Sequence, residues 1–134
     1  MSRFAEVIVI ARNAESVMEP LTRPDEKREW IQCFTPVDDS VFEGTRDGAL
    51  ECYLWVIQFR RQNWKNLLEI LEHLAWPEPH SVQVLVHDED DDCFGLWMIY
   101  EGRLTEVPLP NTERQPFSDT VTGILTRTDR HKKD

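Results

Sequence analysis

The sequence predicts an α+β domain, with a four- or five-stranded mixed sheet and about two helices packed mainly on one face. Short β-branched runs predict the strands, one stretch has the apolar spacing of an amphipathic helix, and no repeat or linker divides the chain. With 134 residues and 40% hydrophobic content, the chain can form one core. We expect a single domain over residues 1–126 and a basic, frayed C-terminal tail over 127–134.

The N-terminal quarter of the chain predicts a strand followed by an interrupted helical segment. FAEVIVIA, residues 4–11, is rich in β-branched residues, which is typical of a largely buried strand. Asn13 is a candidate N-cap for the helical segment that follows. Pro20 and Pro24 interrupt this segment because proline donates no backbone hydrogen bond. Residues 25–34 favour a helix, with a strand as the alternative.

The centre of the chain predicts a loop, a central strand and a helix. Residues 35–48 concentrate Pro, Gly and Asp, which is typical of an irregular surface loop. Residues 49–60 carry apolar side chains at both parities, so both faces of this strand must be covered over much of its length. Asn63 is a candidate N-cap for an amphipathic helix over 64–75, and Pro77 ends it.

The second half of the chain predicts three more strands. Residues 81–87 follow a strand-helix unit, and a right-handed crossover would place them parallel to the central strand. Residues 94–100 and 103–107 are joined by a two-residue hairpin turn in which Gly102 tolerates positive φ. Residues 118–125 predict a short helix.

The charge of the chain restricts its partners. There are 15 Lys and Arg against 25 Asp and Glu, a formal net charge of -10. Residues 127–134 are locally basic, so the folded body is more acidic than the total. Such a field repels phosphate backbones and anionic lipid, and we expect no direct binding of nucleic acid or membrane. The same field attracts a basic protein, and the association rate falls as salt rises.

Cysteine use and hydropathy predict a cytoplasmic protein. Cys33, Cys52 and Cys93 are odd in number and lack CxxC spacing, so we expect reduced core residues and neither disulfides nor a zinc site. No apolar stretch approaches the roughly 20 residues that a membrane span needs. The oligomeric state stays open.

A run of five consecutive carboxylates lies between two predicted strands. It consists of Asp88, Glu89, Asp90, Asp91 and Asp92. Like charges packed into one turn do not stabilise the fold, so this acidic run is a solvated hairpin tip, holds a cation or faces a positive partner. It lacks the spacing and the glycine of a calcium-binding loop, and we predict no specific metal ligands and no cofactor.

Residues near the acidic run complete the predicted partner-binding site. Trp97 would supply an apolar anchor if its side of the strand faces outward. Asp38 and Asp39 form a second acidic patch in the loop before the central strand. Whether this patch shares a surface with residues 88–92 is left open. The predicted partner-binding residues are the acidic run, Trp97, Asp38 and Asp39.

The chain lacks recognisable catalytic motifs. It contains no GxGxxG, P-loop, GxSxG or HExxH sequence, so we expect no enzymatic activity. The leading hypothesis is a small acidic protein-binding module, an immunity- or antitoxin-type inhibitor that occludes a basic partner such as a toxin. The alternatives are a non-enzymatic adaptor or structural subunit of a cytosolic assembly, and a divalent-metal-dependent enzyme that uses the 88–92 turn.

Overall fold

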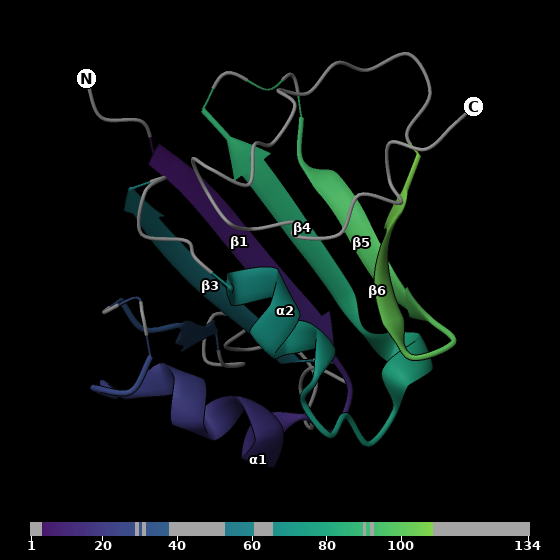
Figure 1. Ribbon diagram of the computed structural model, residues 1–134, viewed down its shortest axis with the longest axis horizontal. Helices are drawn as coiled ribbons and strands as arrows, with labels where there is room; N and C mark the ends of the chain where they lie inside the picture. The colour runs from purple at the N-terminus through teal and green to yellow at the C-terminus, as the bar shows by residue number, and fades with distance from the viewer. Residues whose placement is uncertain are drawn as a thin grey trace, which may run out of the picture.

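The computed structural model describes residues 4–28, 30, 32–37, 53–60, 66–89, 91 and 93–108. They form an α+β fold with one antiparallel sheet of six strands (Figure 1). In chain order the elements are β1 (Phe4–Ala11), α1 (Glu15–Met18), the 3-10 helix η1 (Glu19–Thr22), β2 (Thr35–Val37), β3 (Tyr53–Arg60), α2 (Leu67–Glu72), the 3-10 helix η4 (Pro79–Ser81), β4 (Gln83–Asp88), β5 (Gly95–Tyr100) and β6 (Arg103–Val107).

The strand order is β2-β3-β1-β4-β5-β6, and every neighbouring pair is antiparallel. The first four strands and the two helices follow the β-α-β-β-α-β order of the split β-α-β, or ferredoxin-like, arrangement, and the β5–β6 hairpin extends the sheet beyond β4. The α+β class is confirmed. The sheet has six strands, not four or five, and it is not mixed, because β1 lies between β3 and β4, which run in the same direction.

One side of the sheet, the inner face, carries the core. Val7 of β1 lies opposite Ile57 of β3 and Val86 of β4, and all three are buried. The even-numbered residues of β1 point to the other side, the outer face, because side chains alternate along a strand. The strand predicted over residues 4–11 therefore has its core on one side only.

Helix α2 covers the inner face (Figure 1). Its Leu67, Leu68 and Leu71 are buried, as the amphipathic spacing predicts, and each such side chain contributes about 1.5–3 kcal/mol by leaving water. Trp76 is also buried, and its Nε1 donates a hydrogen bond to the carbonyl oxygen of Leu71 at 2.8 Å. Among the described residues, no helix combines the length and the apolar character needed to cross a lipid bilayer.

The segment predicted as a helix over residues 25–34 is irregular wherever the structure describes it. The Arg28 side chain donates hydrogen bonds to the carbonyl oxygens of Trp30 at 3.1 Å and Gln32 at 2.9 Å. Its guanidinium carbon also lies 4.2 Å from the centroid of the Trp30 ring. One arginine thus binds carbonyl groups that a helix would bind internally, and the helix prediction is wrong for this reason.

Residues with positive φ occur at two places where the sequence predicted a turn or a helix cap. Glu101 and Gly102 have φ of 54° and 78°, the pair of left-handed residues that a tight hairpin needs, so the predicted β5–β6 turn is confirmed. Asn13 has φ of 55°, but Ala14 occupies the N-cap position of α1, and the predicted cap is wrong. The predicted cap Asn63 lies outside the described residues.

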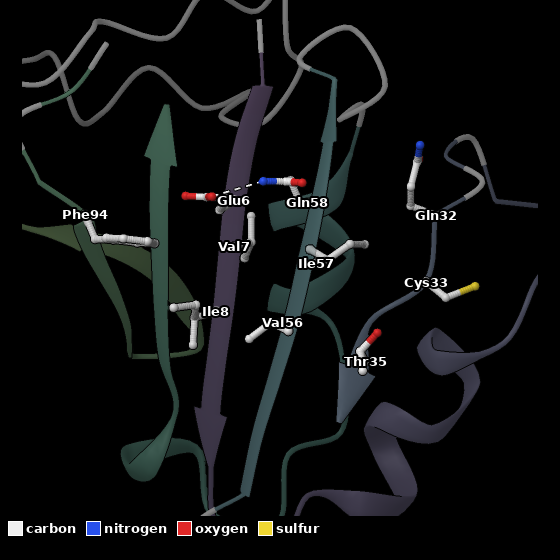
Figure 2. A pocket seen from close by; sticks show the side chains of 10 residues that line it. All are labelled: Glu6, Val7, Ile8, Gln32, Cys33, Thr35, Val56, Ile57, Gln58 and Phe94. Carbon is white, nitrogen blue, oxygen red and sulfur yellow. Dashed lines mark hydrogen bonds between the residues drawn. The ribbon is translucent and has the colours of Figure 1, made fainter. Parts of the chain in front are cut away.

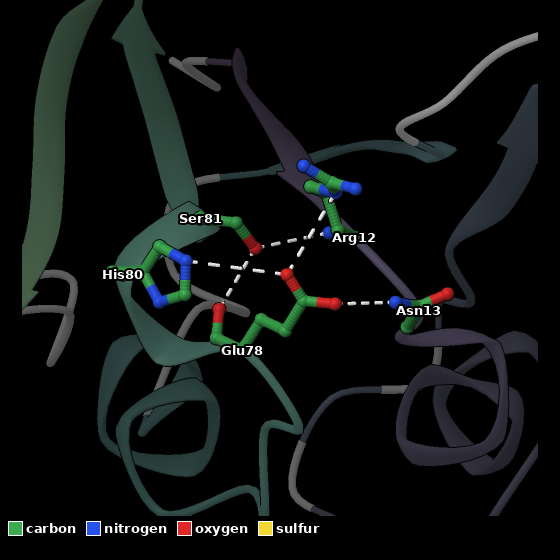
Figure 3. Close-up of polar contacts among 5 residues, drawn as sticks. All are labelled: Arg12, Asn13, Glu78, His80 and Ser81. Carbon is green, nitrogen blue, oxygen red and sulfur yellow. Dashed lines mark hydrogen bonds and ion pairs between the residues drawn. The ribbon is translucent and has the colours of Figure 1, made fainter.

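A cluster around Glu78 joins the end of β1 to the segment before β4 (Figure 3). The Glu78 carboxylate accepts a hydrogen bond from Asn13 Nδ2 and lies 3.7 Å from Arg12 Nε. Ser81 Oγ donates to the Glu78 carbonyl oxygen at 2.8 Å and accepts a hydrogen bond from the Arg12 backbone nitrogen at 3.1 Å. These contacts hold the left-handed turn at Asn13, where the chain leaves the sheet.

Replacement of Glu78 tests the importance of this cluster. We expect Glu78→Ala to lower the free energy of unfolding by about 1–2 kcal/mol, because it removes a charge-assisted hydrogen bond and one partially exposed ion pair. Urea unfolding at neutral pH measures the change. Glu26→Ala, at an exposed site, is the matched control and should shift stability by less than about 0.5 kcal/mol. Equal unfolding midpoints for the two variants would contradict the claim that the Glu78 contacts stabilise the fold.

Candidate functional site

The outer face of the sheet is apolar, although neither α1 nor α2 packs on it. In an antiparallel sheet with one side in water, that side usually carries polar residues. Here the central strands place half-buried aliphatic residues on it, namely Ile8, Ile10, Leu54, Val56, Leu85, Leu96 and Met98. An apolar surface of this kind is typical of a binding surface.

Aromatic residues border the outer face. Phe4 and Tyr100 are the exposed large hydrophobic residues of the described chain, at 47% and 55% exposure. Both share the parity of the outward-pointing residues on their strands, Phe4 on β1 and Tyr100 on β5. Phe94 lies immediately before β5 and is half-buried. Aromatic side chains next to an aliphatic surface are enriched where protein interfaces concentrate their binding energy.

A row of three polar side chains crosses the same face at one end. Gln58 of β3, Glu6 of β1 and His87 of β4 are consecutive partners in the strand register. Gln58 Nε2 donates a hydrogen bond to Glu6 Oε2 at 3.1 Å, and His87 Nδ1 lies 3.4 Å from Glu6 Oε1. The Phe94 ring stacks on the His87 imidazole, with centroids 4.9 Å apart. We call Gln58, Glu6 and His87 the polar row.

A cleft of about 580 Å³ opens beside the polar row. Figure 2 shows Phe94 on one side of β1 and β3, and Gln32, Cys33 and Thr35 on the other side. The cleft floor includes apolar side chains of both strands, and Glu6 is the one charged residue among the described residues that line it. Its volume lies within the range of about 300–1,000 Å³ that is usual for ligand pockets.

Only part of the acidic run reaches the surface in the described chain. Asp88 and Asp91 are buried, whereas Glu89 is exposed. The Asp88 backbone nitrogen donates to Asp91 Oδ2 at 3.1 Å, and the Asp91 backbone nitrogen donates to the Asp88 carbonyl oxygen at 2.8 Å. These two acids therefore help to form the turn with buried side chains, and their contact with a partner stays a prediction. Asp90 and Asp92 lie outside the described residues.

Glu89 connects the turn to the first strand. Its Oε1 accepts a hydrogen bond from the Phe4 backbone nitrogen at 2.8 Å, and its own backbone nitrogen donates to the Phe4 carbonyl oxygen at 3.1 Å. His87 Nε2 lies 3.2 Å from the Asp91 carbonyl oxygen, which ties the polar row to the same turn. The turn thus supports one end of the outer face.

Trp97 does not lie on the outward side of its strand, which was the condition for its predicted role as an anchor. Its side chain is 1% exposed and points to the inner face, where Val84 is its partner in the register. The odd-numbered residues of β5 therefore pack into the core, and Trp97 is not an outward-facing anchor. Tyr100 is the exposed aromatic residue of this strand. Asp38 and Asp39 lie outside the described residues.

The cysteines and the possible metal ligands are the remaining features that the sequence singled out. Cys33 and Cys93 are half-buried, not fully in the core, and Cys52 lies outside the described residues. Within the described ranges, no group of three or more His, Cys, Asp and Glu side chains is placed to hold a metal ion.

The polar row escaped the sequence analysis because its members are distant in the chain. The useful signal was a polar residue at an outward position of an otherwise apolar strand, as with Glu6 in FAEVIVIA and Gln58 in YLWVIQFR. Only the strand order shows that these positions are neighbours.

Comparisons of the chain with protein-family models, with curated proteins and with solved structures found no significant match. The ferredoxin-like arrangement serves many unrelated functions, so fold alone assigns none. The function has to be inferred from the outer face and its cleft.

The role of Asp91 can be tested through protein stability. We expect Asp91→Ala to lower the free energy of unfolding by about 1–3 kcal/mol, because the buried Asp88 N–H loses its acceptor. Asp91→Asn keeps an oxygen acceptor and the side-chain volume, so its loss should be clearly smaller. Chemical unfolding of both variants measures the difference. An increase in stability in both variants would contradict this role. It would indicate that charge repulsion within residues 88–92 outweighs the hydrogen bond that Asp91 accepts.

Proposed function

We propose that this protein is a non-catalytic binding module that uses the outer face of its sheet to occlude a basic protein partner, in the manner of an immunity- or antitoxin-type inhibitor. The observation that carries the proposal is the combination on one face of an aliphatic surface, aromatic residues at its border and a cleft that contains a carboxylate. Phe4, Phe94 and Tyr100 supply the aromatic groups, and Glu6 supplies the charge.

The apolar part of the face supports a stable contact. Burial of aliphatic and aromatic surface provides most of the favourable free energy of protein association. A few aromatic residues surrounded by weaker contacts commonly dominate that energy. The outer face has this composition, and its residues lie on hydrogen-bonded strands, which have less conformational entropy to lose on binding than a loop.

The net charge of -10 supports a basic partner. A strongly negative protein accelerates its encounter with a positive one and disfavours acidic competitors. Fast capture suits an inhibitor that must neutralise a harmful protein soon after synthesis. The aliphatic contacts then determine how long the complex lasts, because differences in affinity lie mainly in the dissociation rate.

The proposal is tested with the product of the reading frame next to that of the protein, with basic toxins as the first candidates. We expect the pair to form a complex, and expression of the protein to restore growth of cells that produce the toxin. The association rate should fall by about tenfold or more between low and physiological salt. Absence of a complex with every basic neighbour, or a rate that does not depend on salt, would contradict the proposal.

The binding face is tested by the double substitution Phe4→Ser and Tyr100→Ser. Both side chains are exposed, so the fold should persist, while the dissociation constant should rise by about tenfold or more. Calorimetric titration with the partner measures the change. Glu15→Ser and Glu26→Ser, at exposed positions on other elements, form the matched control and should change affinity by less than about threefold. Equal effects of the two pairs would exclude the outer face as the binding surface.

A further inference from the structure

The cleft beside Glu6 combines groups that suit one kind of occupant. It has a carboxylate at its rim, aliphatic residues on its floor, an aromatic ring on one wall and an amide on the other. We propose that this cleft receives the guanidinium group of an arginine side chain presented by the partner. The inference rests on the proposed function, since it names the group of the basic partner that the outer face recognises.

Glu6 is positioned to bind a cation. Its Oε2 accepts the hydrogen bond from Gln58, and its Oε1 faces His87, so strand pairing holds the carboxylate in place. A carboxylate has about four lone-pair sites, and these two neighbours occupy at most two of them. The Glu6 side chain is 42% exposed. Both oxygens therefore remain open to the paired N–H groups of a guanidinium.

The walls and the floor of the cleft match the rest of an arginine side chain. Ile8 and Val56 project from β1 and β3 between the two walls (Figure 2). Aliphatic surface of this kind packs against the methylene groups of a long basic side chain while its charged end stays near a carboxylate. Phe94 also lines the cleft, and a guanidinium is attracted to an aromatic ring.

Gln32 lines the opposite wall of the cleft. Its Oε1 is buried and has no hydrogen-bond partner in the part of the chain that the structure describes. Buried acceptors normally have a partner, so this oxygen indicates that a donor is missing. A guanidinium carries five N–H donors and no acceptor, enough to bind Glu6 and still donate to a second group.

Other ligand classes fit the cleft less well. A phosphate or carboxylate ligand would be repelled by Glu6, the one charged residue that lines the cleft within the described part of the chain. A divalent cation requires several oxygen ligands, and the cleft offers one carboxylate. A lysine ammonium has the charge but lacks the planar fork that pairs with both carboxylate oxygens.

The proposal is tested with Nα-acetyl-arginine methylamide, a single arginine residue without further charge. The matched probe is Nα-acetyl-citrulline methylamide, which has nearly the same shape but is neutral. Titration of the protein, monitored by ¹H–¹⁵N correlation NMR, should show saturable shifts at Glu6, Gln58 and the Gln32 side-chain amide. We expect a dissociation constant on the order of millimolar for the arginine probe and binding at least about tenfold weaker for citrulline.

Matched variants identify the group responsible. Glu6→Gln keeps the size of the side chain and should weaken arginine binding by about tenfold or more. Phe94→Leu should weaken it by about threefold. Glu101→Gln removes an exposed carboxylate from the β5–β6 turn and should have no effect. Equal binding of both probes, no saturable shift in a folded protein, or unchanged affinity in Glu6→Gln would overturn the proposal.

These outcomes are separable from those that test the proposed function. If the Phe4 and Tyr100 substitutions weaken a partner complex but arginine does not bind the cleft, the binding face is retained and the arginine assignment is rejected. If arginine binds the cleft but no basic protein binds the outer face, the cleft is a small-ligand site and the inhibitor proposal is rejected.

Discussion

The pairing of β1 with both β3 and β4 is the constraint on which the rest of the structure depends. The eight residues of β1 pair with both neighbouring strands over most of their length. The odd-numbered residues of β1 therefore face the core, and the even-numbered residues face outward. A shift by one residue would place Glu6 in the core and Val7 on the surface. The same pairing aligns Glu6 with Gln58 and His87, so the register that forms the core also forms the polar row.

The predictable part of the fold consists of elements defined by local chemistry. Residues 4–11 form a strand, as their β-branched content predicts. The β5–β6 turn forms because Gly102 tolerates the positive φ that the turn requires. The order of the six strands was not predictable, because β1 is inserted between two strands that follow it in the chain. Residues 25–34 were misjudged because Arg28 binds their carbonyl groups, and no periodic pattern signals such contacts.

The candidate site was less predictable than the fold. The sequence drew attention to the acidic run, but tertiary packing buries Asp88 and Asp91 and uses them to build a turn. Charge density alone does not distinguish a carboxylate that binds a partner from one that accepts a backbone N–H. Trp97 was misassigned because β5 carries large apolar residues at both parities. The cleft depends on side chains from four separate segments, which become neighbours only in the folded sheet.

The three-residue strand β2 has a consequence for how the protein behaves at high concentration. Pro36 occupies its central position, opposite Trp55, and a proline has no N–H with which to recruit a further strand. An edge that is short and interrupted in this way resists the strand-by-strand stacking that leads to aggregates and fibrils. The β2 edge therefore does not readily add strands from other copies of the protein. The outer face of the sheet stays accessible to a different protein.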